Sequence, residues 1–199
     1  MLIYIMGAGV LPTTIYNDKI YFLFGKENKY EKSSHGFSDF GGGTDNNESF
    51  LKTAIREAGE ELTGFLGSEK EVKTMLTKYG NIKIDYKSGN YDTYRTHIFP
   101  IKYDEKLPFY YNNNQRFIQK HLDPKIIKKT RIFEKAEIRW ISLEDLSKMR
   151  GIFRPFYQNI IDEILLNKEK ISFFIKNAMK KMNKTNKRRI SKKKTMKQR

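Results

Sequence analysis

Residues 41–64, GGGTDNNESFLKTAIREAGEELTG, constrain this chain most, because they join a glycine-rich turn to an amphipathic helix. Positions three and four apart are neighbours on a helix, so Glu57, Glu60 and Glu61 share one stripe. A different stripe is apolar and suited to burial, and it consists of Leu51, Ala54, Ile55, Ala58 and Leu62. Such a helix can hold hard divalent cations, since magnesium prefers oxygen ligands and is often shared with substrate phosphates.

Acidic residues on a helix are commonly no more than its solvated face, but here the whole spacing is informative. Gly42 is followed after five residues by Glu48, after seven more by Arg56-Glu57, and after two more by Glu60-Glu61. This spacing resembles the Nudix box of the Nudix hydrolase family, Gly-x5-Glu-x7-Arg-Glu-U-x-Glu-Glu-x-Gly-U, where U is a bulky apolar residue. Ala58 takes one of the U positions.

The box departs from the family pattern at its end, where Thr63 stands in place of the expected glycine and Gly64 follows one residue late. A glycine at a helix end commonly adopts the left-handed conformation. We therefore interpret the box as stretched by one residue, with Gly64 ending the helix and the carboxylates unmoved.

The resemblance covers roughly residues 1–150 and implies a Nudix-like α/β/α sandwich with a mixed sheet. The segment AEIRWISLEDL, a strand followed by a capped helix, is similar to the end of many Nudix domains. Two further parts lie outside the resemblance: a C-terminal helical extension over 151–182 and a basic tail over 183–199.

Family members cleave a phosphoanhydride bond of a nucleoside diphosphate linked to another moiety, and they use Mg²⁺ or Mn²⁺. The resemblance implies that Glu60 and Glu61 are metal ligands. It implies that Glu57 is a third ligand or the general base, and that the Gly41 carbonyl is a further ligand. Three residues are expected to support the motif without reacting: Gly42, Glu48 and Arg56.

A further carboxylate often comes from outside the box in this family. Glu134 and Glu137, just before the strand that contains Trp140, are the candidates, and we favour Glu134 because it lies in the loop. The alternative is a solvated strand edge beside Lys135 and Arg139.

Substrate contacts are less readable from the sequence. Lys26 and Arg95 are candidates to contact phosphate, and both also suit plain surface charge. The aromatic residues Phe109, Tyr110 and Tyr111 either stack on a base or anchor the core.

The net charge of +16 is concentrated at the C-terminus. Thirteen of the 39 Lys and Arg lie in residues 170–199, which contain no Asp or Glu, so the first 169 residues are nearly balanced. From about residue 183 the sequence has almost no apolar content, which predicts a disordered tail. Such a tail suits RNA, DNA or an anionic membrane surface, and RNA is the first expectation. A solubility tail or a nuclear address is the alternative.

The chain has no cysteine, which excludes a disulfide framework and thiolate chemistry. Its apolar first residues lack a basic leader and are interrupted by Gly7, Gly9 and Pro12, so they predict a strand and neither a signal peptide nor a membrane span. A cytoplasmic location is expected, with the nucleus as an alternative because of the basic tail.

Local patterns predict the elements around the box. The expected strands are 2–15, 19–26, 37–40, 81–87, 91–103 and 136–141. The expected helices are 47–62 with Asn46 or Asn47 as N-cap, one after Ser68, 113–121, a short one after Ser142, and 156–182 with a break near Asn167.

These features lead to three functional hypotheses. The first is a hydrolase acting on phosphoanhydride bonds, with the mRNA cap (decapping) as a substrate that would explain the basic tail. The second is a hydrolase of free nucleotides, dinucleoside polyphosphates or inositol pyrophosphates. The third is a Nudix-like RNA-binding module without catalysis, which the retained carboxylates argue against.

Overall fold

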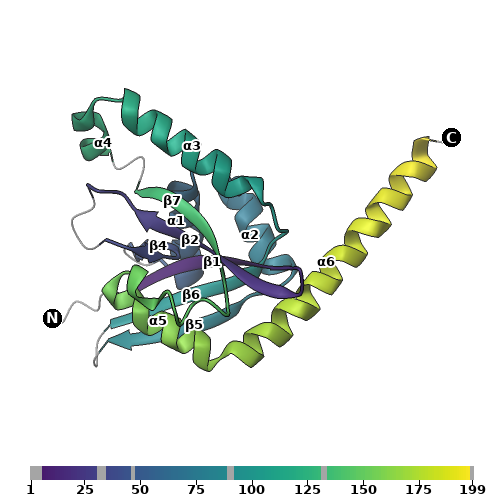
Figure 1. The fold of residues 1–199 in the computed structure, drawn as a ribbon. Coiled ribbons are helices and arrows are strands. Elements are labelled where there is room, and N and C mark those ends of the chain that lie inside the picture. Colours follow the sequence, from purple (N-terminus) through teal and green to yellow (C-terminus); the bar gives the residue numbers. More distant parts are fainter. Residues whose placement is uncertain (1–5, 31–34, 46–47, 89–91, 131–133, 198–199) are drawn as a thin grey trace.

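A mixed sheet lies at the centre of the molecule in the computed structural model (Figure 1). The structure describes residues 6–30, 35–45, 48–88, 92–130 and 134–197. Within them the strands are β1 (Met6–Tyr16), β2 (Lys19–Glu27), β3 (Phe37–Ser38), β4 (Phe40–Gly43), β5 (Ile82–Ser88), β6 (Asp92–Pro100) and β7 (Lys135–Ser142). Their order is β3-β2-β1-β6-β5, with β4 paired to β1 and β7 paired to β2. The β1–β6 pair is parallel, whereas β1 runs antiparallel to β2 and to β4.

Two predicted hairpins form the frame of this sheet. β1 and β2 are joined at Asn17 and Asp18, whose φ angles of 47° and 60° give the left-handed turn that a two-residue hairpin requires. β5 and β6 pair in register from Ile82 opposite Ile98. Both hairpin predictions are confirmed, because alternating apolar residues on both sides of a polar turn fix the register.

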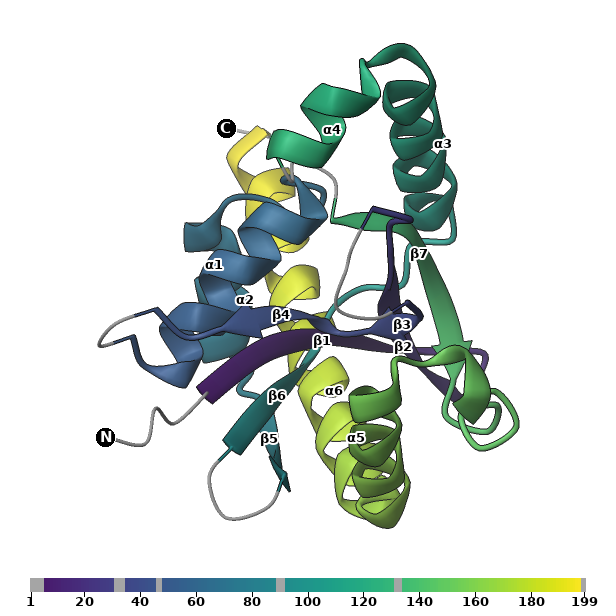
Figure 2. The same cartoon turned by 90° about the vertical axis from the view of Figure 1, so that its left-hand side faces the viewer.

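Helices cover both faces of the sheet (Figures 1 and 2). One face carries α1 (Phe50–Leu62), α2 (Glu69–Lys78) and α3 (Lys106–His121), and α4 (Pro124–Thr130) follows α3. The other face carries α5 (Pro155–Leu166) and the first part of α6 (Lys168–Lys197). A separate apolar core lies between each helical layer and the sheet, so the predicted α/β/α arrangement is confirmed.

Some element boundaries differ from the sequence predictions. α1 begins at Phe50 and Ser49 is its N-cap, accepting a hydrogen bond from Lys52 N at 3.3 Å; Asn46 and Asn47, the predicted caps, lie outside the described residues. The predicted α-helix after Ser142 is instead a run of turns that ends in a short 3₁₀ helix, Arg150–Ile152. Local side-chain hydrogen bonds favour the turn, because Ser142 Oγ bonds both the backbone and the side chain of Asp145.

The predicted break near Asn167 is confirmed as the junction between α5 and α6. The tail differs from its prediction, because α6 continues to Lys197 where disorder is expected from residue 183. Its last turns project away from the rest of the molecule (Figure 1). Lysine, arginine and methionine are good helix formers, and lengthening an existing helix requires no new nucleation.

The buried imidazole of His97 on β6 gives a testable pH dependence. Its Nδ1 lies 2.9 Å from Asn81 Oδ1, and burial lowers the pKa of His97 to about 4. Between pH 6.5 and pH 4 the imidazole of His97 is protonated in the unfolded chain and neutral in the folded chain. The stability due to His97 is therefore lost as the pH falls through this window. We expect the free energy of unfolding to fall less steeply between pH 6.5 and pH 4 in His97→Gln than in the wild type. Urea titrations at several pH values measure both curves, and parallel curves would contradict the assignment.

Candidate active site

Helix α1 packs beside the glycine-rich end of β4. The apolar stripe of α1, including Ala54, Ala58 and Leu62, is buried against the sheet, which turns the next stripe toward β4. A Cβ atom on Gly42 would lie 2.5 Å from Glu57 Oε1, so a larger residue here would displace this carboxylate. The N–H of Gly41 donates to Glu61 Oε2 at 2.8 Å.

Three carboxylates converge at this point. Glu57, Glu61 and Glu134 each place one oxygen within 4.8 Å of the others. Glu57 and Glu61 lie one turn apart on α1, whereas Glu134 comes from the segment directly before β7. The structure therefore brings together three of the five carboxylates that the sequence put forward as ligands or bases, and Glu137 is not among them. Glu60 lies outside this cluster, with a side chain 59% exposed and Oε2 3.3 Å from an Arg56 nitrogen.

Burial opposes the negative charge of this cluster. Burial raises the pKa of Glu57, and Arg56 beside it opposes the shift. Burial also raises the pKa of Glu61 well above its ordinary value, against the attraction of Lys135. Carboxylate oxygens that are buried close together repel one another, and a hard divalent cation bound between them would offset this repulsion.

A buried lysine that the sequence prediction did not include holds one side of the cluster. The Lys135 ammonium is fully buried and contacts Glu27 Oε1, Ser38 Oγ at 2.9 Å and Glu61 Oε1 at 3.2 Å. Arg154, at the start of α5, donates to the same Glu27 oxygen at 2.8 Å. Burial lowers the pKa of Lys135, but attraction to Glu61 and Glu27 outweighs this effect and raises the pKa.

Arg56 is the centre of a second network, on the solvent side of the cluster. Its guanidinium donates to Glu57 Oε1 at 2.8 Å, to Glu48 Oε2 at 3.1 Å and to the Gly43 carbonyl at 3.1 Å. Hydrogen bonds from Arg56 lower the pKa of Glu48 to about 2. These contacts tie the loop before α1 to the helix, and the supporting role that the motif implies for Arg56 and Glu48 stays a prediction.

The remaining candidates fall in different places. Lys26 lines a pocket beside the start of β7. The contacts of Arg95 are with residues outside the cluster: it pairs with Asp85 at 2.6 Å and lies over the Phe50 ring. Tyr111 is buried and donates to the backbone carbonyls of Glu61 at 2.7 Å and Lys135 at 3.1 Å. Its neighbours Phe109 and Tyr110 are exposed, so Tyr111 supports the site from the core.

A buried acid that the sequence prediction also omitted lies under the glycine-rich strand. Asp39 accepts hydrogen bonds from Tyr94 Oη at 2.7 Å and Thr96 Oγ1 at 2.8 Å. A Cβ on Gly41 would lie 2.3 Å from the same Tyr94 hydroxyl. Burial raises the pKa of Asp39 to about 6. The sequence does not indicate that Asp39 is buried, because an isolated Asp close to a glycine run also suits a turn.

A pocket of about 600 Å³ opens next to the same glycines. Its walls include the aromatic rings of Tyr86, Tyr94 and Phe156 together with Arg154. Rings beside a cationic side chain can accommodate a nucleobase and an adjoining phosphate.

The end of α1 corrects the interpretation of the box as stretched. The helix ends at Leu62, and Thr63 itself adopts the left-handed conformation with φ 47° and ψ 37°. Gly64 follows with φ 81°. The helix exit is therefore not shifted, and an exposed β-branched residue takes the strained conformation that glycine tolerates.

Thr63→Gly is expected to stabilise the protein by roughly 1 kcal/mol, because glycine adopts this conformation without the Cβ clash. Urea or thermal unfolding measures the change. Gly64→Ala is the matched substitution in the opposite direction and should destabilise the chain. A Thr63→Gly protein less stable than the wild type would contradict the assignment.

Comparison with known proteins places the fold. No family model matches the chain, and no curated protein matches its sequence. Among solved structures, an Ap4A hydrolase binary complex from C. elegans gives a TM-score of 0.47 at 16% identity, over 80% of this chain and 93% of that chain. A Nudix hydrolase from M. smegmatis gives a TM-score of 0.49 at 14% identity, over 84% and 88% of the two chains.

A third similar structure reaches a TM-score of 0.50 at 14% identity. It is a bifunctional NMN adenylyltransferase/ADP ribose pyrophosphatase from Francisella tularensis, complexed with AMP and a manganese ion, and the match covers 84% of this chain and 42% of that chain. Likeness at this level of identity shows the fold alone, and it agrees with the α/β class predicted from the sequence. Within the described residues, no helix has an apolar stretch of the length that a bilayer crossing requires.

Proposed function

We propose that this protein is a divalent-metal-dependent hydrolase that cleaves a phosphoanhydride bond of a nucleoside diphosphate linked to another moiety. The observation that carries the proposal is the convergence of Glu57, Glu61 and Glu134 on the glycine-rich end of β4. Glycine allows the backbone to approach the carboxylates closely, and the spacing of the box residues is that of the Nudix motif.

The oxygen donors at this point fit Mg²⁺ or Mn²⁺. We assign Glu57, Glu61 and Glu134 as ligands, with the Gly41 carbonyl and Glu60 as further donors. Glu60 is exposed and next to Glu61 in the chain. Rotation of its side chain would break the contact with Arg56 and allow its carboxylate to reach a bound ion. A bound ion would offset the negative charge of the diphosphate and acidify a water molecule.

The protein's own side chains prepare this arrangement. Lys135 and Arg154 neutralise Glu27, and Lys135 and the Gly41 N–H fix both oxygens of Glu61. Arg56 fixes Glu57. We assign acceptance of the proton from the attacking water to Glu57 or Glu134. The pKa of Glu57 is raised toward neutral pH, and a general base is most effective when its pKa lies near the pH of the reaction.

We further propose that the nucleoside occupies the aromatic pocket beside Gly41–Gly43. A polymer substrate such as capped RNA is favoured by the C-terminal part of α6, which projects from the body and belongs to the segment with thirteen Lys and Arg and no acid (Figure 1). A binding module without catalysis is disfavoured, because a buried acidic cluster repels phosphate and is costly to keep.

Product analysis tests the proposal. The full chain is incubated with Mg²⁺ or Mn²⁺ and either cap-labelled RNA or a panel of free nucleotides, dinucleoside polyphosphates and inositol pyrophosphates. Release of a capped nucleoside diphosphate from RNA would establish decapping, whereas cleavage of small molecules alone would limit the activity to them. A protein that cleaves none of these compounds, with either ion, would overturn the proposal; EDTA in parallel reactions shows whether any cleavage depends on metal.

A further inference from the structure

A second pocket, of about 630 Å³, lies between the end of β2, the start of β7 and helix α3. Three exposed cations line it: Lys26 at the end of β2, Lys29 just after that strand, and Arg116 on α3. We call it the cationic pocket. His35 also lines it, and Asn112 and Gln119 of α3 add neutral polar groups.

The cations of this pocket are not neutralised by the acids beside them. Lys26 lies over the Phe37 ring, Lys29 lies over the Tyr30 ring, and Arg116 donates to Asn113 Oδ1 at 2.7 Å. Within the described part of the chain, no carboxylate pairs with any of the three. The pocket has two acids of its own, Glu27 and Glu137.

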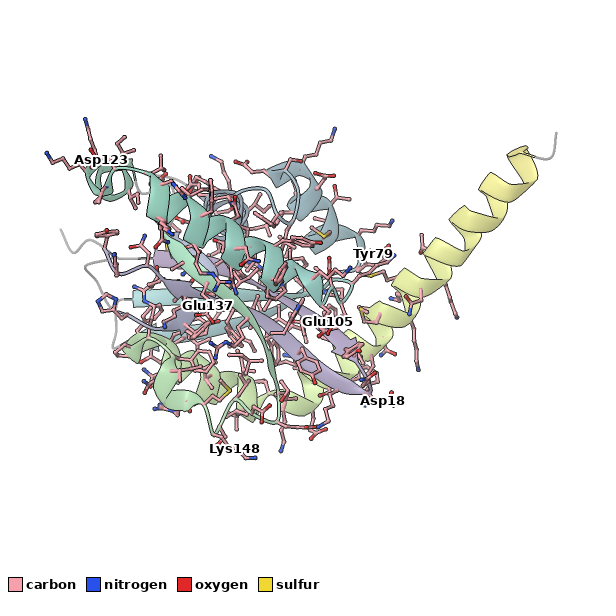
Figure 3. All side chains as sticks on the ribbon, turned by 45° about the horizontal axis from the view of Figure 1, so that its top comes forward. Asp18, Tyr79, Glu105, Asp123, Glu137 and Lys148 are labelled. Carbon is pink, nitrogen blue, oxygen red and sulfur yellow. The ribbon has the colours of Figure 1, made fainter. Side chains whose placement is uncertain are left out.

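Both of those acids are engaged elsewhere. Glu27 is buried against Lys135 and Arg154. Glu137, labelled on β7 next to α3 in Figure 3, accepts from Arg139 at 2.6 Å. The pocket therefore presents a net positive surface, which favours an anionic ligand over a neutral one.

The cationic pocket is a neighbour of the carboxylate cluster, to which it is linked by buried side chains and by the chain itself. Glu27 lines the pocket, and its carboxylate contacts the same Lys135 ammonium that reaches Glu61. Ala136 and Glu137 also line the pocket, two and three residues beyond Glu134. Two residues of a strand span only about 7 Å. The pocket therefore lies within the span of a few phosphate groups from Glu134.

We infer that the cationic pocket binds phosphate groups of the substrate that lie beyond the diphosphate being cleaved. This inference rests on the proposed function and narrows it. The substrate class is then a nucleotide joined through its diphosphate to a group that carries further phosphates, and a substrate with two phosphates alone would leave the pocket unused. Arginine and lysine side chains suit such groups, because their hydrogen bonds to phosphate are charge-assisted.

Calorimetric titration of inorganic tripolyphosphate into the full chain, in EDTA, tests the pocket separately from metal chemistry. The pocket variant replaces Lys26, Lys29 and Arg116 by Gln. The control variant removes the same charge at three other exposed lysines, Lys102, Lys148 and Lys168; Figure 3 labels Lys148, well away from Glu137. Any binding by the basic end of α6 is common to all three proteins.

We expect the dissociation constant to rise at least about tenfold in the pocket variant, since three charge-assisted contacts are lost. The control variant should change it by only about twofold, through the weaker general field. Equal weakening in both variants, or none in the pocket variant, would overturn the inference, because binding would then depend on net charge alone.

Kinetics with two substrates tests whether the anion is part of the substrate. The pocket variant should raise the KM for a dinucleoside tetraphosphate about tenfold at unchanged kcat, and leave the KM for a dinucleoside diphosphate as it is. Equal KM changes for both substrates would refute the role in substrate binding. If the wild type hydrolyses neither compound, the role of the pocket in binding such substrates is refuted. The product analysis described above then decides the proposed function, and the tripolyphosphate titration decides whether the pocket binds anions.

Discussion

Lys135→Met should destabilise the protein by about 3–5 kcal/mol, the usual cost of removing one partner from a buried ion pair. Lys135 is fully buried, and its ammonium contacts Glu27, Ser38 and Glu61. Methionine fills a similar volume without the charge, so two buried carboxylates would face each other with only Arg154 near Glu27. Urea unfolding at neutral pH measures the loss.

Two comparisons make this result specific. Lys148→Met removes an exposed lysine and should change stability by no more than about 0.5 kcal/mol. Adding Glu27→Gln to Lys135→Met should restore part of the loss, because the two side chains are coupled. A Lys135→Met protein as stable as the wild type would mean that the buried network does not hold this part of the structure together.

The same variant gives information about the cation site. When Lys135 is absent, a divalent ion at the carboxylates supplies the missing positive charge. Manganese should therefore raise the melting temperature of Lys135→Met by more than it raises that of the wild type. Equal increases in the melting temperatures of the two proteins would mean that Lys135 does not influence the metal site.

The sequence was sufficient for the parts of the fold that depend on local pattern. The hairpin at Asn17-Asp18, the box helix and the α5–α6 junction at Asn167 each combine hydrophobic periodicity with a turn or capping residue. Periodicity of this kind is set by which face is buried, so it can be predicted without knowledge of distant contacts.

The tertiary part of the site could not be predicted in this way. Lys135 looks like an exposed residue at a strand edge, but the pairing of β2 with β7 shifts between Lys26 and Glu27. An irregularity of this kind changes which side chains point inward, and here it directs Lys135 to the core. No local pattern reveals that irregularity, nor the approach of Arg154, 127 residues away along the chain, to Glu27.

Glu60 illustrates the limit of motif spacing. Glu57, Glu60 and Glu61 fall on one stripe of an ideal helix, and spacing alone cannot rank them. Packing separates them, because Glu61 reaches Gly41 N–H while Glu60 stays exposed beside Arg56. Its predicted role as a ligand remains a prediction until metal binding is measured for the Glu60→Gln protein.

Glu61→Gln is expected to lower turnover by about a hundredfold to a thousandfold. Loss of a metal ligand removes several kcal/mol of transition-state stabilisation, and each 1.36 kcal/mol is about tenfold in rate. In the unliganded protein Glu61 Oε1 faces the Lys135 ammonium and Oε2 accepts from Gly41 N–H. An amide can satisfy one of these donors only, so we also expect a stability loss of about 1–3 kcal/mol.

Two readouts separate the loss of turnover from the loss of stability. Turnover is measured well below the melting temperature of the variant, at which the folded fraction is close to that of the wild type. Manganese should raise the melting temperature of the wild type and have little effect on that of Glu61→Gln, since the ligand is missing. Glu144→Gln removes the same charge from an exposed side chain that pairs with Lys19, and it should keep both turnover and the manganese response. If Glu61→Gln keeps wild-type turnover, the carboxylate cluster is not the catalytic centre, and the proposed hydrolysis would have to be sought elsewhere on the fold.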